Sequence, residues 1–386
     1  MKTICSTSVV AIAAVLALVG SPAFAQKAQE KPKPFDVARP TNIAVDPSAA
    51  ASAEAIKSME AELAKPRTQP GYTTPRLKIG QPDLSGVWTS ASNTVLTRPG
   101  QFKSLVMNEE ENAKAQAVHP QNVRQATDDN QKHEDGLLDG SDLAAGRGYN
   151  SFWIDPGKSY ANVKGSWRTS WIVDPPNGQI PVTENGKKEM AAARGFQLRG
   201  TGYDNPEERG PGERCIIGFG GSAGPPLQNS LYNNNYQISQ APGHVVITTE
   251  MVHDARIIKL NGKHGPAALN KYMGDSIGWF EGDTLVVETV AINQNGGSAI
   301  RITPDGKMIE RFTRYNDKQI LYEFEVHDPK LYTKVWKGEM SLNSSPGIYE
   351  YACHEGNYGL FNILIGGRVA DRKGVNISEA GDRDEM

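Results

Sequence analysis

A run of short apolar segments joined by tight turns, between residues 231 and 343, constrains the fold more than any other feature of this sequence. No helical pattern separates the segments, and turn signals such as Asn261-Gly262 follow them closely. Strands joined in this way pair antiparallel with their neighbours. The predicted strands lie at 236–240, 244–251, 255–260, 276–280, 284–290, 308–315, 319–327 and 332–342. We therefore expect a mainly β protein, an antiparallel β-barrel or sandwich with a few short helices and long loops.

The rest of the chain divides by composition into four parts. Residues 1–25 predict a signal peptide, 26–80 an extended arm with one helix at 47–64, 81–376 a single β-rich domain, and 377–386 a charged tail. Two further helices are expected, at 108–118 with Asn108 as N-cap and at 183–194 with Thr183 as N-cap. Residues 199–229 are rich in Gly and Pro and predict a rim loop or lid.

The first 25 residues have the three parts of a secretory signal peptide. Lys2 supplies the positive start, residues 9–19 are apolar, and Ala23 and Ala25 occupy the −3 and −1 positions of a cleavage site. The apolar stretch is too short for a permanent transmembrane helix. We expect a periplasmic or secreted mature protein without a membrane span.

Net charge limits the kinds of partner that this protein can bind, and the number of cysteines bears on whether it forms a disulfide. The formal charge is −3 with both signs dispersed, which argues against a nucleic-acid partner, since that would need a basic stripe. Once Cys5 leaves with the signal, Cys215 and Cys353 remain. An even pair in an oxidising compartment predicts a disulfide.

Several sequence segments resemble those of a large family of uncharacterised secreted bacterial proteins. They are PDLSGVW at 82–88, RTSWIVDPP at 168–176, EMVHDARII at 250–258, EGDTLVVET at 281–289 and YEYACHEGNY at 349–358. The resemblance spans residues 82–370 and implies no particular reaction. The Leu-x-Gly-x-Trp opening followed by hairpins is also similar to lipocalin-like barrels.

Two clusters join an imidazole to carboxylates and form the predicted catalytic site. The first holds Glu250, His253, Asp254 and Arg256, and a bulge at 253–254 would turn both His253 and Asp254 inward. The second holds His354 between Cys353 and the carboxylate Glu355. Imidazole titrates near neutral pH and a carboxylate fixes its tautomer, which is the pairing that acid–base catalysis uses. The alternative is a solvated strand end, with His354 serving a structural role.

Around these clusters we expect substrate-binding groups at Tyr232, Asn234, Glu355 and Tyr358, although residues 232–236 also fit a turn entering a strand. No cofactor is expected. A metal is an alternative, because His253, His264, His354 and Glu250 could supply ligands, but no local metal-binding spacing is present.

Three functional classes follow from these features. The first is a cofactor-independent acid–base enzyme, a lyase, isomerase or hydrolase that acts on a small organic molecule. The second is a non-catalytic lipocalin-like protein that binds an apolar ligand, and the third is an envelope-associated structural protein. Ionisable groups on the late strands favour the first class, since a carrier pocket would be mostly apolar.

Overall fold

The predicted strand run closes on itself in the computed structural model of the chain. The structure describes residues 50–123, 157–199, 202–218, 222, 224–230, 232–269, 271–293 and 300–374. These residues belong to one compact unit, Arg39–Met386. The predicted signal peptide (1–25) and charged tail (377–386) lie outside the described residues.

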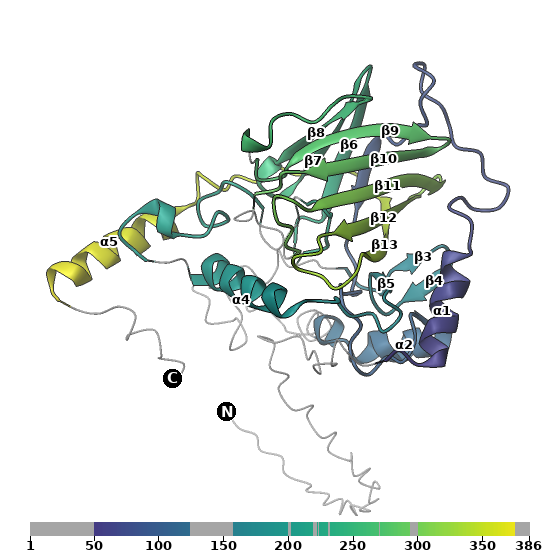
Figure 1. Ribbon diagram of the computed structural model, residues 1–386, viewed down its shortest axis with the longest axis horizontal. Helices are drawn as coiled ribbons and strands as arrows, with labels where there is room; N and C mark the ends of the chain where they lie inside the picture. The colour runs from purple at the N-terminus through teal and green to yellow at the C-terminus, as the bar shows by residue number, and fades with distance from the viewer. Residues whose placement is uncertain are drawn as a thin grey trace, which may run out of the picture. The chain divides into compact units, whose positions relative to one another are not determined.

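Nine of the described strands form a closed β-barrel (Figure 1). They are β1 (Gly86–Thr89), β6 (Asn235–Ala241), β7 (His244–Thr249), β8 (Ala255–Leu260), β9 (Asp275–Glu281), β10 (Thr284–Val290), β11 (Lys307–Asn316), β12 (Gln319–His327) and β13 (Trp336–Ser344). Strand β1 closes the barrel because Trp88 pairs with Tyr236 of β6 on one side and with Ser344 of β13 on the other. The prediction of a mainly β barrel is confirmed.

One pair of strands differs from the antiparallel prediction. Strands β8 and β9 are parallel, with Ile258 opposite Ser276. The Asn261-Gly262 turn does not start a hairpin. Asn261, at φ +52°, donates its N–H to the Gly278 carbonyl, and because β8 and β9 are parallel the chain returns along the barrel before β9 begins. The connection is therefore a return loop, which places two consecutive strands side by side in the same direction.

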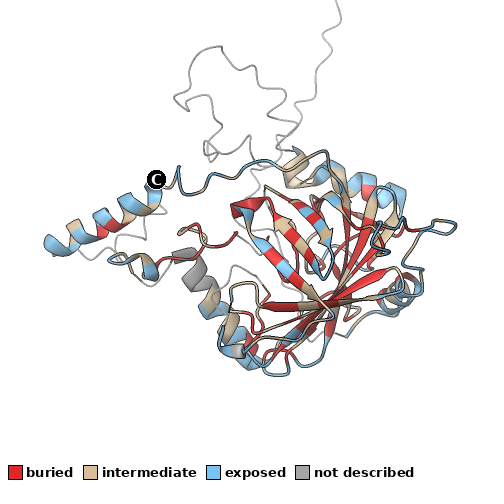
Figure 2. Cartoon of the chain, turned by 90° about the horizontal axis from the view of Figure 1, so that it is seen from above, coloured by how far each residue is buried: buried red, intermediate tan, exposed pale blue. Residues whose placement is uncertain are grey.

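Large apolar side chains fill the barrel interior. Successive residues of a strand point to opposite faces, and buried and more exposed residues alternate along several of the strands (Figure 2). The interior side chains include Trp88, Tyr236, Phe312, Tyr322, Phe324 and Trp336, each at most 2% exposed. Gly338 makes room for this packing, because a Cβ there would lie 2.2 Å from Cζ of Phe324.

Short elements flank the barrel. Strands β2 (Val106–Met107), β3 (Asn162–Val163) and β4 (Ser166–Arg168) form a small second sheet, and β5 (Ile172–Asp174) pairs with β13. The helices are α1 (Ala53–Leu63), α2 (Glu109–Val118), α4 (Glu184–Arg199) and α5 (Tyr358–Arg372), with 3₁₀ turns η2 (Pro206–Glu208), η4 (Met251–His253) and η5 (Ala267–Leu269).

Three of these helices, α1, α2 and α4, lie where local sequence signals predict them. Helix α1 lies within the predicted 47–64, and α2 begins after Asn108, which forms a capping box with Glu111. Helix α4 begins after Thr183, whose hydroxyl accepts the Gly186 N–H, and it extends five residues beyond the predicted end, from 194 to 199. Helix α5 was not predicted.

A buried ion network fastens α1 and the small sheet to the outside of the barrel. Glu339 of β13 accepts hydrogen bonds from Lys164 Nζ and Arg168 Nη2, each at 2.8 Å. Arg168 also lies 3.0 Å from the carboxylate of Glu62 in α1. All four side chains are at most 5% exposed. Charges this deeply buried persist only with their partners in place.

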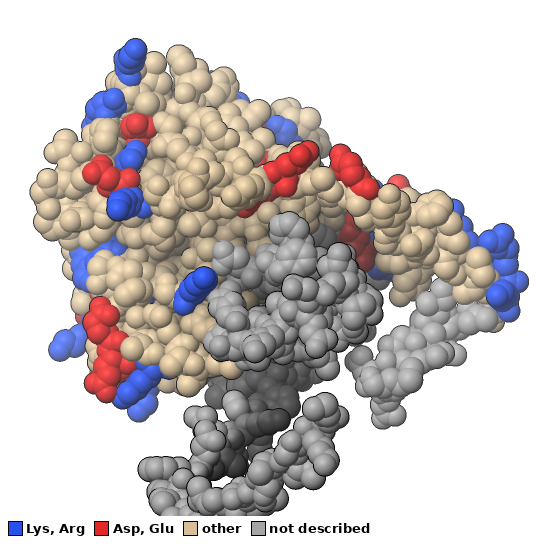
Figure 3. All heavy atoms as spheres, turned by 180° about the vertical axis from the view of Figure 1, so that it is seen from behind, with Lys and Arg blue, Asp and Glu red and all other residues tan. Residues whose placement is uncertain are grey.

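None of the helices in the described ranges is long and apolar enough to cross a membrane. Acidic and basic side chains lie next to one another on the face shown in Figure 3. This mixing agrees with the near-neutral net charge of the sequence.

The ion network yields a stability prediction. Glu339→Ala leaves Lys164 and Arg168 buried without a carboxylate on the barrel, so the free energy of unfolding should fall by about 3–5 kcal/mol. The control is Glu323→Ala, because Glu323 lies directly opposite Glu339 on β12 but pairs with the exposed Arg67. That change should cost less than about 1 kcal/mol. Equal losses for the two variants in urea unfolding would contradict the role given to the network.

Candidate functional site

A tight connection between β7 and β8 carries the first predicted cluster. The two strands pair antiparallel, and the 3₁₀ turn η4 joins them. Val252 and His253 adopt φ values of +59° and +47°, a region that non-glycine residues, and β-branched Val above all, rarely enter. The segment is therefore a strained turn, and its neighbouring side chains point in different directions.

Glu250 connects the two predicted clusters. Its side chain is buried, its Oε2 accepts a 2.7 Å hydrogen bond from Asn235 Nδ2, and its Oε1 accepts one from the Tyr349 N–H at 3.0 Å. Tyr349 begins the second motif, 99 residues further along the chain. The structure thus brings the 250–256 and 349–358 segments together, and the Glu250 carboxylate is used to hold them.

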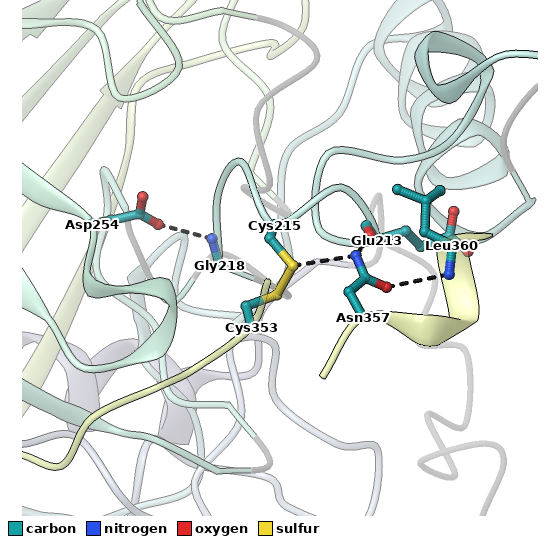
Figure 4. The surroundings of a disulfide bond; sticks show 7 residues. All are labelled: Glu213, Cys215, Gly218, Asp254, Cys353, Asn357 and Leu360. Atoms are coloured by element: carbon teal, nitrogen blue, oxygen red, sulfur yellow. Dashed lines mark hydrogen bonds between the residues drawn. A yellow bond between two sulfur atoms is a disulfide. The ribbon is translucent and has the colours of Figure 1, made fainter. Parts of the chain in front are cut away.

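The predicted disulfide between Cys215 and Cys353 is confirmed (Figure 4). Next to it, Asn357 Nδ2 donates to the Glu213 carbonyl at 2.7 Å and to Cys215 Sγ at 3.4 Å. The same side chain caps α5, because its Oδ1 accepts the Leu360 N–H. The bridge, the 213–218 loop and the start of α5 therefore form one linked unit.

Asp254 is the carboxylate that lies against this unit. Its Oδ2 accepts a 2.8 Å hydrogen bond from the Gly218 N–H, three residues beyond the bridged Cys215 (Figure 4). Burial raises the pKa of Asp254 from 3.8 to about 6, and the Gly218 hydrogen bond and the nearby His253 oppose this shift only in part. A carboxyl group with such a pKa exists in both protonation states close to neutral pH.

The two predicted catalytic histidines are both exposed. His253 follows the strained Val252 and is close enough to Asp254 to influence its pKa. His354 follows the bridged Cys353 in a turn, and the His354 carbonyl accepts the Asn357 N–H. Glu250 joins the segments that carry the two imidazoles, and the disulfide joins the His354 segment to the Cys215 loop, although no contact between the two rings is present.

Arg256 lies inside the barrel. Its Nη1 and Nη2 form a bidentate ion pair with Glu310 of β11, at 2.5 and 2.9 Å. Burial acts to lower the pKa of Arg256, but Glu310 more than offsets this and the net pKa is raised. Tyr322 donates its hydroxyl to the same carboxylate at 2.7 Å. Arg256 is thus engaged in the core rather than at the site of Asp254.

Glu310 was missed by the sequence reasoning, although a signal was present. It stands between Met308 and Phe312 on the apolar side of its strand, where a carboxylate requires a buried partner. The partner lies on a distant strand and could not be identified from spacing.

The predicted substrate-binding residues have different positions. Asn234 is buried and closes a turn with Ser230, accepting the Ser230 N–H at 2.6 Å, which agrees with the turn alternative. Tyr232 is half-buried. It lies near Tyr351, whose own burial, together with the nearby Tyr232, raises the pKa of Tyr351 to about 12. Glu355 and Tyr358 are exposed.

One part of the Gly- and Pro-rich segment, which was predicted as a rim loop or lid, packs into the barrel, whereas residues 213–218 belong to the disulfide-linked unit. Leu227 is fully buried in the core, and its N–H donates to the Tyr322 hydroxyl at 2.9 Å. The Tyr236 hydroxyl donates to the Gln228 carbonyl at 2.9 Å. Leu227 and Gln228 therefore hold this part of the segment against the barrel core.

The alternative metal-ligand set is not assembled within the described residues, where no three His, Cys, Asp or Glu side chains are placed to hold a metal ion. His264 lies elsewhere, with Nδ1 3.2 Å from Asp275 and Nε2 3.2 Å from Glu288. Neither carboxylate was anticipated as its partner.

The raised pKa of Asp254 predicts how its replacement depends on pH. Between pH 4 and pH 6 the folded state binds a proton at Asp254 that the unfolded state has released, so folding stability falls as pH rises through this window and stays lower above it. Asp254→Asn keeps an oxygen for Gly218 and removes this cost. Its melting temperature relative to wild type should therefore be higher at pH 7.5 than at pH 4. Asp283→Asn, in the β9–β10 turn, is the control: Asp283 is half-buried but pairs with Arg76, so its replacement should show no such gain. A flat difference for Asp254→Asn would contradict the shift.

Comparison of the chain with protein-family models, with curated proteins and with solved structures finds no match. Functional inference therefore rests on the residues themselves. The feature that carries it is the Asp254 carboxyl, held against the disulfide-linked loop beside two segments that each present an exposed histidine.

Proposed function

We propose that this protein is an exported acid–base enzyme, a lyase, isomerase or hydrolase, that acts on a small organic molecule at the β7–β8 end of the barrel. Asp254 is the proposed proton-transfer group, with His253 and His354 as its partners. The observation that carries the proposal is the position of Asp254, which is half-buried against the disulfide-linked loop with the Gly218 N–H as its hydrogen-bond partner at 2.8 Å; this partial burial raises its pKa to about 6. A general acid or base is most effective when its pKa is near the working pH.

The supporting structure around Asp254 suits such a role. Its hydrogen-bond partner Gly218 lies on a loop anchored by the disulfide, and its own turn is anchored through Glu250 to the second motif. A catalytic group is most effective when surrounding bonds fix its position. The exposed imidazole of His253, next to this half-buried carboxyl group, could exchange protons both with solvent and with a bound molecule.

The packing of the barrel favours the enzyme over the lipocalin-like carrier. A carrier of that type holds an apolar ligand inside the barrel, whereas here Trp88, Phe312 and Phe324 fill the described interior and Leu227 packs in among them. An enzyme site at the end of the barrel needs no cavity within it.

Export to the periplasm or beyond is part of the proposal. The disulfide supports it, because structural disulfides persist in oxidising compartments. The predicted signal peptide is the other argument.

The test compares turnover of a panel of small hydroxy acids, esters and lactones by wild type and variants, followed by proton NMR. Asp254→Asn should lower the rate by about 10²–10⁴-fold, as the removal of a general acid or base does. His253→Ala and His354→Ala should also lower it. His244→Ala, at an equally exposed histidine where β7 begins, is the control and should leave it unchanged. Turnover that survives in Asp254→Asn, or no turnover of any compound by wild type, would contradict the proposal.

A further inference from the structure

A polar cavity of about 380 Å³ lies on the outer face of the barrel, away from the Asp254 site. The end of α1 and the chain segment that follows it form one wall, and strands β11, β12 and β13 form the other. Its volume is within the range of about 300–1,000 Å³ found for small-molecule sites. None of its lining residues belongs to the predicted catalytic clusters.

The register of the strands places charged side chains on this wall. Arg311 lies opposite Glu323, and Lys337 lies opposite Glu325. Their neighbours Phe312 and Phe324 belong to the barrel core, so the charged residues face outward. Arg67, which follows α1, reaches the same surface and binds Glu323 through Nε at 2.7 Å.

Cations exceed carboxylates among the accessible groups of the cavity. Lys164 and Glu339 form a buried pair at its base, and Lys65 pairs with Glu62 at 2.8 Å. The other charged lining residues are three cations, Arg67, Arg311 and Lys337, and two carboxylates, Glu323 and Glu325. The accessible part therefore carries a net positive charge.

Hydrogen-bond donors are also in surplus. Arg67 uses Nε for Glu323, and Arg311 uses Nη1 for Glu325, while a guanidinium has five N–H groups. Lys337 Nζ lies 3.7 Å from Glu325, beyond hydrogen-bond distance. Both oxygens of Glu325 are engaged, one by Arg311 and the other by His327. An incoming anion would therefore find donors available at all three cations.

Part of the lining is apolar. Leu63, the last residue of α1, and Pro66, which follows the helix, lie on one wall, and Val173 of β5 also lines the cavity. We propose that this cavity binds a small organic carboxylate with an apolar body. The carboxylate lies between Arg67, Arg311 and Lys337, and the apolar body contacts Leu63 and Pro66.

The test is a titration of the full folded chain with benzoate in low-salt buffer free of other carboxylates, followed by calorimetry. Benzoate should bind saturably, and benzylamine, which has the same ring and the opposite charge, should not bind. Arg67→Gln and Lys337→Gln should each weaken benzoate binding about tenfold or more, the expected cost of losing a charge-assisted hydrogen bond. Both side chains are partly exposed, so neither change should prevent folding.

Two controls separate this site from others. Lys307→Gln removes a surface cation elsewhere on the barrel and should leave the affinity unchanged. Asp254→Asn should also leave it unchanged, so that failure of the enzyme proposal and failure of this one are distinguishable. The inference is overturned if benzoate does not bind, if benzylamine binds as well, or if Arg67→Gln and Lys337→Gln bind benzoate as wild type does.

Discussion

The bond between Cys215 and Cys353 is the constraint on which the rest of the structure depends most. Eight of the nine barrel strands, from β6 to β13, lie between the two cysteines. The bridge closes a loop with a sequence separation of 138 and so ties the two ends of this strand run together. On the chain-entropy model a loop of this length stabilises the fold by about 5 kcal/mol. The same bond fixes the Gly218 loop against Asp254, so it links the stability of the barrel to the proposed acid–base site.

Three charged residues close together in sequence have three different roles, because a strained turn separates them. Glu250 is used to hold the second motif, Asp254 lies against the disulfide-linked loop, and Arg256 points into the barrel to meet Glu310. Arg256 has its charge matched by the Glu310 carboxylate, and Glu250 accepts several hydrogen bonds. Asp254 has one backbone N–H, and its burial is a cost to stability. Groups that reduce stability in this way are concentrated at functional sites.

Much of the fold could be predicted because its signals are local. The strands of the hairpins, the Asn108 cap of α2 and the composition of α1 each depend on residues within a few positions of one another. The parallel β8–β9 pair and α5 could not be predicted in this way. Asn261-Gly262 normally marks a hairpin, and the cap of α5 depends on Asn357, which is also held by the Cys215 loop.

The site was less predictable than the fold for the same reason. Sequence reasoning found both motifs and the disulfide, but it could not tell which carboxylate would be desolvated. That depends on Gly218, 36 residues before Asp254, and on a strained Val252 that redirects the chain. The partner of Arg256 was hidden in the same way, since Glu310 lies 54 residues away.

The most direct test of this account is a carbon-13 NMR titration of the Asp254 carboxyl group, in the oxidised protein and in a Cys215→Ser/Cys353→Ser double variant that remains folded. The account predicts a midpoint of about 6 in the oxidised protein, because burial disfavours the carboxylate. Without the bridge the Gly218 loop is released and water reaches Asp254. Burial is the larger cause of the shift, so its loss should outweigh the loss of the Gly218 hydrogen bond, and the midpoint should fall toward the ordinary 3.8. A midpoint near 3.8 in the oxidised protein, or the same raised midpoint in both proteins, would contradict the account.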